Sequence, residues 1–433
     1  MLTATTILDN FERLGWKDNN DPMGQMFCLW QQDPTLLGEL VTEFLNRSLK
    51  SYTFIDAALE LMDDDTYIST VNHAWKLAAL GCDSPALPDV LDSAALQYPQ
   101  VFADDWERLL IAVASKLGGP RYMSDVAWRA LDPVTAKDWM NQLSLSAINE
   151  SLGYERAVAL LYSRQRDIVL NTWRSIFCKQ AKLSEQEWRL MSAGYELNGD
   201  TLRELHSDSP LHIDLSLEQR KHILAGLPEW QRNNRISHSS WQSDTNTITV
   251  GHMGGLLPHT CGLCYAPLQR LLSLKQPKLA GIASNTAIEF GTCLSCLGWE
   301  SDGAMFYRHD AQGNPYSHPI QQSDVIQTPQ FSQANLLEAE VNLYRASHRW
   351  AYQDWGTSND RQNLHRVGGA PSWIQGAEYP DCPDCHRRMY FVMQLDSGLP
   401  LADGNEWLWG SGGCNYTFWC EDCRVSAHLW QCT

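Results

Sequence analysis

The sequence predicts an α+β protein with several domains, in which a helical N-terminal half precedes a β-rich half with two duplicated four-cysteine units. Three observations predict this. Apolar residues in the first half recur at helical spacing, short β-prone runs separated by Gly and Pro begin near residue 233, and eight later cysteines form four Cys-x-x-Cys pairs. We expect domains over residues 1–232, 233–330 and 331–433, a usual size for a chain of 433 residues.

Residues 33 to about 230 have the pattern of helices, and the segment 104–118 shows it best. Five apolar side chains there fall on one helical face: Trp106, Leu109, Leu110, Val113 and Leu117. The breakers Gly118, Gly119 and Pro120 follow. Repeated helices with short turns predict a bundle or an irregular solenoid, without a fixed repeat period.

Polar caps and acidic first turns mark the starts of several predicted helices, because they satisfy or favour the first backbone N–H groups. The motifs are Asp63 to Asp65, Asp132 before Pro133, the capping box Ser184 to Glu187 between Leu183 and Trp188, and Ser216 with Gln219. In the second half we expect strands over Thr247–Val250, Ala287–Phe290, Met305–Tyr307 and Met389–Met393, and one connecting helix over Leu336–Trp350.

The second half contains an internal repeat. Residues 261–274 align with residues 382–395 at a constant offset, and six positions match in residue type. Both segments begin with a Cys-x-x-Cys knuckle, and each copy is followed by another knuckle with a Phe just upstream. The sequence therefore predicts two versions of one cysteine-bearing β unit.

The spacing of these knuckles is typical of zinc ligands, because two Cys-x-x-Cys turns complete a tetrahedron of thiolates around one ion. The predicted first site is Cys261, Cys264, Cys293 and Cys296, and the second is Cys382, Cys385, Cys420 and Cys423. Four thiolates leave no open position, so we expect two structural zinc sites.

Other interpretations of the cysteines stay open at this point. The knuckles could be redox-active dithiols or could bind an iron–sulfur cluster. A histidine beside a knuckle, His259 or His386, could replace a thiolate, although hydrogen bonding or exposure is the simpler expectation. We expect Cys28, Cys82 and Cys178 to be small buried residues, and Cys414 and Cys432 to pack rather than ligate.

The net charge of −18 is unevenly distributed. Residues 1–100 hold 15 acidic and 5 basic residues, which disfavours nucleic-acid binding there and would attract a basic protein. Solubility is the simpler explanation for such a surface. No apolar stretch has the length of a membrane span, and the N-terminus lacks the pattern of a signal peptide, so we expect a cytoplasmic protein with reduced cysteines.

A search for catalytic machinery finds no convincing set, and we therefore expect a protein that is not an enzyme, with no catalytic and no cofactor-binding residues beyond the metal ligands. Tyr307-Arg308-His309-Asp310 pairs a histidine with an acid, but neighbouring residues on a strand face opposite ways, and a turn is the better interpretation. Gly368-Gly369-Ala370-Pro371 lacks the lysine and following helix of a phosphate loop.

The C-terminal segment also carries motifs that resemble a known family. They are Arg366-Val-Gly-Gly-Ala-Pro371-Ser-Trp373-Ile-Gln375, the strand Met389-Tyr-Phe-Val-Met-Gln-Leu395, and the turn Gly410-Ser-Gly-Gly413, together with the knuckles at Cys382 and Cys420. This combination, over about residues 366–433, resembles the YwqG-like family, a bacterial domain of unknown biochemical function. The first unit has Gly251-His-Met-Gly-Gly255 at the matching place but lacks the Pro-x-Trp-x-Gln continuation.

Relatives of that family occur among immunity proteins of polymorphic toxin systems. The resemblance therefore implies an immunity protein that occludes a cognate toxin, such as a type VI or Rhs-like effector domain with nuclease or ADP-ribosyltransferase activity. An acidic face would steer the toxin, and Trp anchors would hold it. The alternatives are a metal-dependent or redox enzyme and a zinc-ribbon nucleic-acid-binding protein, and net charge disfavours the latter.

Overall fold

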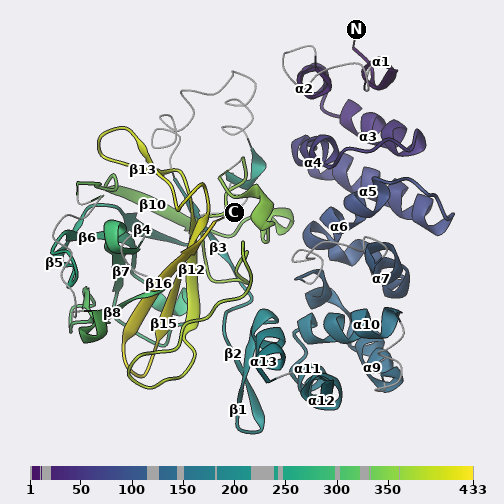
Figure 1. The fold of residues 1–433 in the computed structure, drawn as a ribbon. Helices are drawn as coiled ribbons and strands as arrows, with labels where there is room; N and C mark the ends of the chain where they lie inside the picture. Colours follow the sequence, from purple (N-terminus) through teal and green to yellow (C-terminus); the bar gives the residue numbers. More distant parts are fainter. Residues whose placement is uncertain are drawn as a thin grey trace. The chain divides into compact units, whose positions relative to one another are not determined.

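The computed structural model describes residues 2–9, 11, 21–114, 126–143, 151–180, 183–215, 238–241, 247–297, 303–321, 331, 333–359 and 361–432. The chain divides into two compact units (Figure 1). One comprises Met1–Ala181 with Pro228–Asn234, and the other comprises Lys182–Leu227 with Arg235–Thr433. Each unit has its own buried apolar side chains.

The first unit is helical, as predicted. Its helices lie against their neighbours along the chain, so that a continuous apolar core runs through the stack (Figure 1). They are α1 Ala4–Asp9, α2 Pro22–Gln32, α3 Leu36–Asn46, α4 Tyr52–Leu61, α5 Asp64–Ala79, α6 Leu87–Gln97, η1 Pro99–Phe102, α7 Trp106–Ala114, η2 Trp128–Ala130, α9 Pro133–Gln142, α10 Ser151–Tyr162, α11 Arg166–Thr172, η4 Trp173–Phe177 and α12 Cys178–Gln180.

The predicted capping residues lie at the starts of these helices. The Asp63 carboxylate accepts the Thr66 N–H at 2.7 Å, and the Asp132 carboxylate accepts the N–H groups of Val134 and Thr135 at 2.9 Å. Helix α13, Leu183–Ser192, begins at the predicted capping box, whose side chains up to Gln186 lie outside the described residues, as do Leu117, Ser216 and Gln219. Caps of this kind contribute about 1 kcal/mol each.

Two helix predictions were wrong. Residues 195–214 form strands β1 Tyr195–Asn198, β2 Thr201–Glu204 and β3 Leu211–Asp214. The reason lies partly in Gly199, which turns β1 into β2 at φ +61°, a conformation that glycine adopts easily. The predicted helix over 336–350 contains strand β10, Ala339–Tyr344, because strands on both sides satisfy its backbone.

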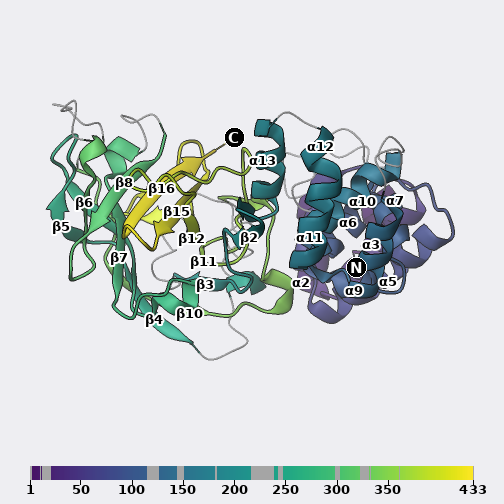
Figure 2. The same ribbon diagram turned by 90° about the horizontal axis from the view of Figure 1, so that it is seen from below.

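One large antiparallel sheet of twelve strands organises the second unit, in the order β5-β6-β4-β10-β3-β11-β12-β15-β16-β8-β9, with β7 also paired to β6. Figure 2 shows β4, β10 and β3 side by side. The further strands are β4 Thr249–Met253, β5 Leu256–Thr260, β6 Pro267–Leu274, β7 Ile288–Thr292, β8 Met305–His309, β9 Pro315–Ser317, β11 Arg366–Val367, β12 Tyr390–Asp396, β15 Cys414–Cys420 and β16 Val425–Gln431.

The sheet bends into a near-barrel, and its strands β4, β7, β8 and β12 overlap the four runs predicted from sequence, with shifted ends. A separate hairpin pairs β13 with β14. The remaining short elements are β13 Leu399–Pro400, β14 Glu406–Trp407, η5 Ser239–Trp241, η6 Pro277–Ala280, η8 Pro319–Gln321, η9 His348–Trp350 and η10 Trp355–Thr357.

The internal repeat extends to the register of the strands. Strand β6 pairs with β7 as β12 pairs with β15, and each pair has a β-bulge at the equivalent residue, Leu271 or Val392. Strands β4 and β11 run into equivalent Gly-Gly turns, in which Gly254 and Gly368 both have φ +70°. These matches show that the two β units share one backbone plan.

The two copies are also intertwined. Strand β3 precedes the first copy in sequence but pairs with β11 of the second, while β10 precedes the second copy and pairs with β4 of the first. Strands β3 and β10 pair with each other at the centre. Each copy therefore completes the sheet of the other, which ties the two cysteine-bearing units into one body.

Candidate metal centres

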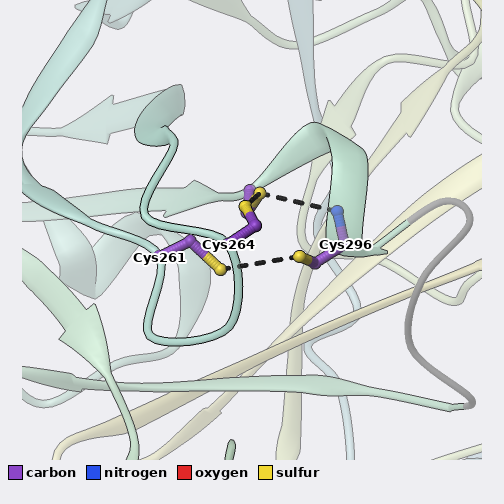
Figure 3. Close-up of side chains that lie close together, drawn as sticks. Cys261, Cys264 and Cys296 are labelled. Atoms are coloured by element: carbon purple, nitrogen blue, oxygen red, sulfur yellow. Dashed lines mark hydrogen bonds between the residues drawn. The ribbon is translucent and has the colours of Figure 1, made fainter. Parts of the chain in front are cut away.

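The structure brings the eight predicted cysteines together in two groups of four. Within each group all ligand sulfur atoms lie within 4.8 Å of one another. In the first group the sulfurs of Cys261 and Cys296 are 3.7 Å apart, and those of Cys264 and Cys293 are 3.5 Å apart. Figure 3 shows the Cys261–Cys264 loop facing Cys296 on a short helical turn.

The backbone builds the two first knuckles in the same way. The Cys261 N–H donates to the Ala266 carbonyl at 2.8 Å, and the Cys382 N–H donates to the Arg387 carbonyl at 2.9 Å. The residue after each second cysteine adopts a left-handed conformation, with φ +58° at Tyr265 and +56° at His386. This turn aims both sulfurs to one side, as a shared metal ion requires.

The first cluster lies in the protein interior. Its four cysteines are between 0% and 8% exposed. The N–H groups of Leu263 and Cys296 donate to the sulfurs of Cys261 and Cys293 at 3.4 and 3.5 Å, and such contacts stabilise thiolates. Hydrogen bonds from the neighbouring thiols lower the pKa of Cys261 strongly, while the same neighbours raise the pKa of Cys296.

The second cluster is nearer to solvent. Cys382 and Cys420 are buried, whereas Cys385 and Cys423 are half-buried, and the sulfurs of Cys385 and Cys420 are 3.6 Å apart. Burial raises the pKa of Cys385, but hydrogen bonds from Arg387 and from the neighbouring thiols outweigh it and lower this pKa to about 6. The Arg387 side chain also forms an ion pair with Asp422.

Each cluster contains four cysteines, the number of ligands in a tetrahedral zinc site. His259 points to a carboxylate instead, since its Nε2 lies 3.5 Å from the Asp310 carboxylate. His386 occupies the left-handed position of its knuckle and belongs to neither group. The two histidines that could have replaced a thiolate are therefore not needed as ligands.

The remaining cysteines differ partly from expectation. Cys28 and Cys178 are exposed, not buried, because they lie on the outer faces of α2 and α12. Cys82 is half-buried, and Cys432 is half-buried near the chain's end. Cys414 packs in the core as predicted, with its sulfur 3.5 Å from the Asp396 carboxylate.

Asp396 belongs to a buried polar network that the sequence did not reveal. Its carboxylate accepts hydrogen bonds from the Ser358 hydroxyl at 2.7 Å and from the N–H groups of Asn359 and Ser397 at 2.9 and 2.8 Å. Complete burial nevertheless raises the pKa of Asp396 to about 7. An acid that ends a largely apolar strand is the sequence signal for this group.

The motifs around Arg366, Trp373 and Gln394 have structural roles. The buried Arg366 guanidinium donates to Gln353 and Ser372, and the Ser372 N–H donates to the Gln394 side chain at 2.9 Å. The Trp373 ring packs on Tyr416 with centroids 4.6 Å apart. These residues hold the segment after the Gly-Gly turn against β12 and β15.

The histidine of the segment 307–310 is held by buried hydrogen bonds. His309 ends β8 rather than lying in a turn, and its Nδ1 and Nε2 contact the Gly313 carbonyl and the Ser426 hydroxyl at 3.0 and 2.9 Å. Burial lowers the pKa of His309 to about 4, and Ser426 is fully buried. Gly368 and Gly369 pack against Ser207 and Pro210, so the turn that contains them is filled by these residues and is not an open loop.

A cavity of about 230 Å³ lies beside the second cluster, within the β-rich unit. Cys420 contributes to its wall, together with Tyr390 and Trp419. Charged residues of both signs complete the lining, among them Arg203, Glu204, Arg387 and Glu421.

Among the described helices, none has the length and apolarity that crossing a membrane requires.

Comparison with known proteins identifies no family. No family model matches the chain, and no solved structure matches it. The uncharacterized protein YpfL of Salmonella typhimurium is 35% identical over 68 residues, which are 16% of this chain. The aligned part spans about 15% of that relative's own length, and its description gives no activity.

Proposed function

We propose that each four-cysteine cluster binds one zinc ion, and that the protein acts by binding a partner rather than by catalysis. The observation that carries the first part is the sulfur geometry. Four thiolates at about 2.3 Å from one ion have tetrahedral S–S separations of about 3.8 Å. Three sulfur–sulfur separations in the two clusters, of 3.5 to 3.7 Å, fit this single-ion arrangement.

Zinc bound there would supply a cross-link and no reactive position. In the first cluster, one knuckle precedes β6 and the other follows β7, the strand paired with β6. In the second cluster, one knuckle precedes β12 and the other begins at the end of β15, the strand paired with β12. The ion would hold the ends of these strands together, and four thiolates leave no site for substrate. This argument supports a structural role.

The partner we propose is a cognate bacterial toxin, which the protein would neutralise by stoichiometric occlusion. The resemblance of residues 366–433 to the YwqG-like family supports an immunity role. The acidic balance of residues 1–100, within the helical unit, suits a basic toxin surface. The hydroxyl of Ser426, which His309 contacts, is buried and therefore is not accessible as a nucleophile.

Metal analysis of the full chain tests the first part. Protein purified without added metal should contain about two zinc ions and no iron. A zinc content near zero, or iron in its place, contradicts the assignment.

Co-expression in a sensitive host tests the second part. Cells that make the toxin encoded beside this gene should survive when this protein is present, and the two chains should co-purify in equal amounts. Survival without a physical complex would indicate an enzyme that reverses the toxin's damage, and occlusion would then be wrong.

A further inference from the structure

The two candidate metal centres occupy equivalent places in the repeat, but their cysteines differ in solvent exposure. Cys264 and Cys385 are equivalent, and so are Cys296 and Cys423. The first member of each pair is buried, and the second is half-buried. Because the backbone plan is shared, this difference arises from what packs over each knuckle.

Other parts of the chain close over the first cluster. The Phe331 N–H donates to the hydroxyl of Ser295, which lies inside the knuckle, at 3.1 Å, and the Trp430 indole donates to the Leu297 carbonyl at 2.9 Å. The Cys293 N–H donates to the Tyr307 hydroxyl at 3.0 Å. As a result, Leu294 and Ser295 are no more than 2% exposed.

The corresponding residues of the second cluster face solvent. Glu421 and Asp422 occupy the places of Leu294 and Ser295, and both are exposed. The adjoining cavity reaches Cys420 directly. A small solute can therefore approach the sulfurs of the second cluster without any opening of the fold, whereas the first cluster is shielded.

We propose that the second cluster is a thiol-oxidation site, at which hydrogen peroxide converts Cys385 and Cys420 into a disulfide and displaces the metal. This inference rests on the proposed zinc binding. The two sulfurs are 3.6 Å apart, close to van der Waals contact, and a disulfide requires them to close to about 2.05 Å.

The reaction balances with peroxide as the two-electron oxidant. A thiolate attacks one peroxide oxygen to give a sulfenic acid and, after protonation, one water. The second thiolate attacks that sulfur, forms the S–S bond and releases hydroxide, which takes a proton to become the second water. Cys382 and Cys423 then remain as two ligands, fewer than the four that a structural zinc site uses.

The test uses the zinc-loaded full chain and a few equivalents of peroxide. Zinc release is followed with a chromogenic chelator, and the disulfide is located by differential alkylation and mass spectrometry. We expect one of two ions to leave at least tenfold faster than the other, with Cys385 and Cys420 joined while the equivalent pair Cys264 and Cys293 stays reduced.

The repeat provides matched variants. Cys385→Ser removes a ligand of the second cluster, so it should remove the fast phase together with one ion, whereas the equivalent substitution Cys264→Ser in the first cluster should leave the fast phase intact. The pair of variants therefore assigns the fast phase to the second cluster, and the disulfide mapping on the wild type tests the oxidation itself. Equal release rates for the two ions, or first oxidation in the first cluster, would overturn the proposal. Protein that contains no zinc would contradict the metal assignment instead, and thiol mapping on that protein would still show whether Cys385 and Cys420 oxidise first.

Discussion

The buried carboxyl of Asp396 makes a quantitative prediction about stability and pH. Its pKa is about 7 in the folded protein, against an ordinary value of 3.8 that we take for the unfolded chain. The folded state therefore binds the proton more tightly, and stability falls as pH rises between these two values. Below about pH 4 and above about pH 7 this contribution is constant.

The magnitude follows from the shift. A difference of about 3 pKa units corresponds to about 4 kcal/mol across the whole range, at 1.36 kcal/mol per unit. Between pH 5 and pH 8 the linkage relation gives a loss of about 2.5 kcal/mol in the free energy of unfolding. Because Asp396 is fully buried, solvent does not screen its carboxylate, and the whole pKa shift is converted to free energy.

The substitution Asp396→Asn isolates this effect, because asparagine keeps the shape and an accepting oxygen but does not titrate. Urea unfolding of both proteins, measured at pH 5 and pH 8, should show the wild type losing about 2.5 kcal/mol more than the variant. Other titrating groups and the metal sites are common to both proteins and cancel in the comparison. An identical pH dependence in the two would refute the burial argument.

Further predictions concern the metal sites, the core and the partner. Cys385→Ser should expose new sites to limited proteolysis after residue 250 while the helical unit stays resistant, since structural zinc contributes about 10–16 kcal/mol in small domains. Trp373→Ala should cost about 3–5 kcal/mol in urea unfolding, because the ring is buried against Tyr416. Asp132→Ala should cost about 1 kcal/mol through the lost cap of α9. The association rate with a cognate toxin should fall as salt increases, and a salt-independent rate would contradict electrostatic steering.

The features that were predicted correctly are local in sequence. The caps at Asp63 and Asp132 depend on residues two or three positions away, so a short window contains the whole motif. The knuckles are four-residue turns, and their duplication at constant offset is enough to group the eight cysteines into two sets. Helix stripes such as Trp106, Leu109 and Leu110 are local for the same reason.

The features that were missed depend on distant partners. The sequence of β3 has no strand pattern that sets it apart from the helical segments before it. It forms a strand because β10 and β11, more than a hundred residues away, satisfy the hydrogen bonds of its backbone. Strand β10 itself was predicted as helix, although pairing on both sides decides otherwise. Cys28 and Cys178 were expected inside, yet no periodicity indicates which side of a short helix a lone cysteine takes.

The sequence by itself determined the helical and β-rich halves, the duplicated units and the cysteines that meet in each cluster, since covalent spacing and residue type suffice for these. The tertiary structure decided how the copies intertwine through β3 and β10, and which cluster is shielded. It also decided the burial of Asp396. The physical reason is that solvent access and strand pairing depend on contacts between segments far apart in the chain, and each equivalent cysteine has the same local sequence pattern whether or not another segment covers it.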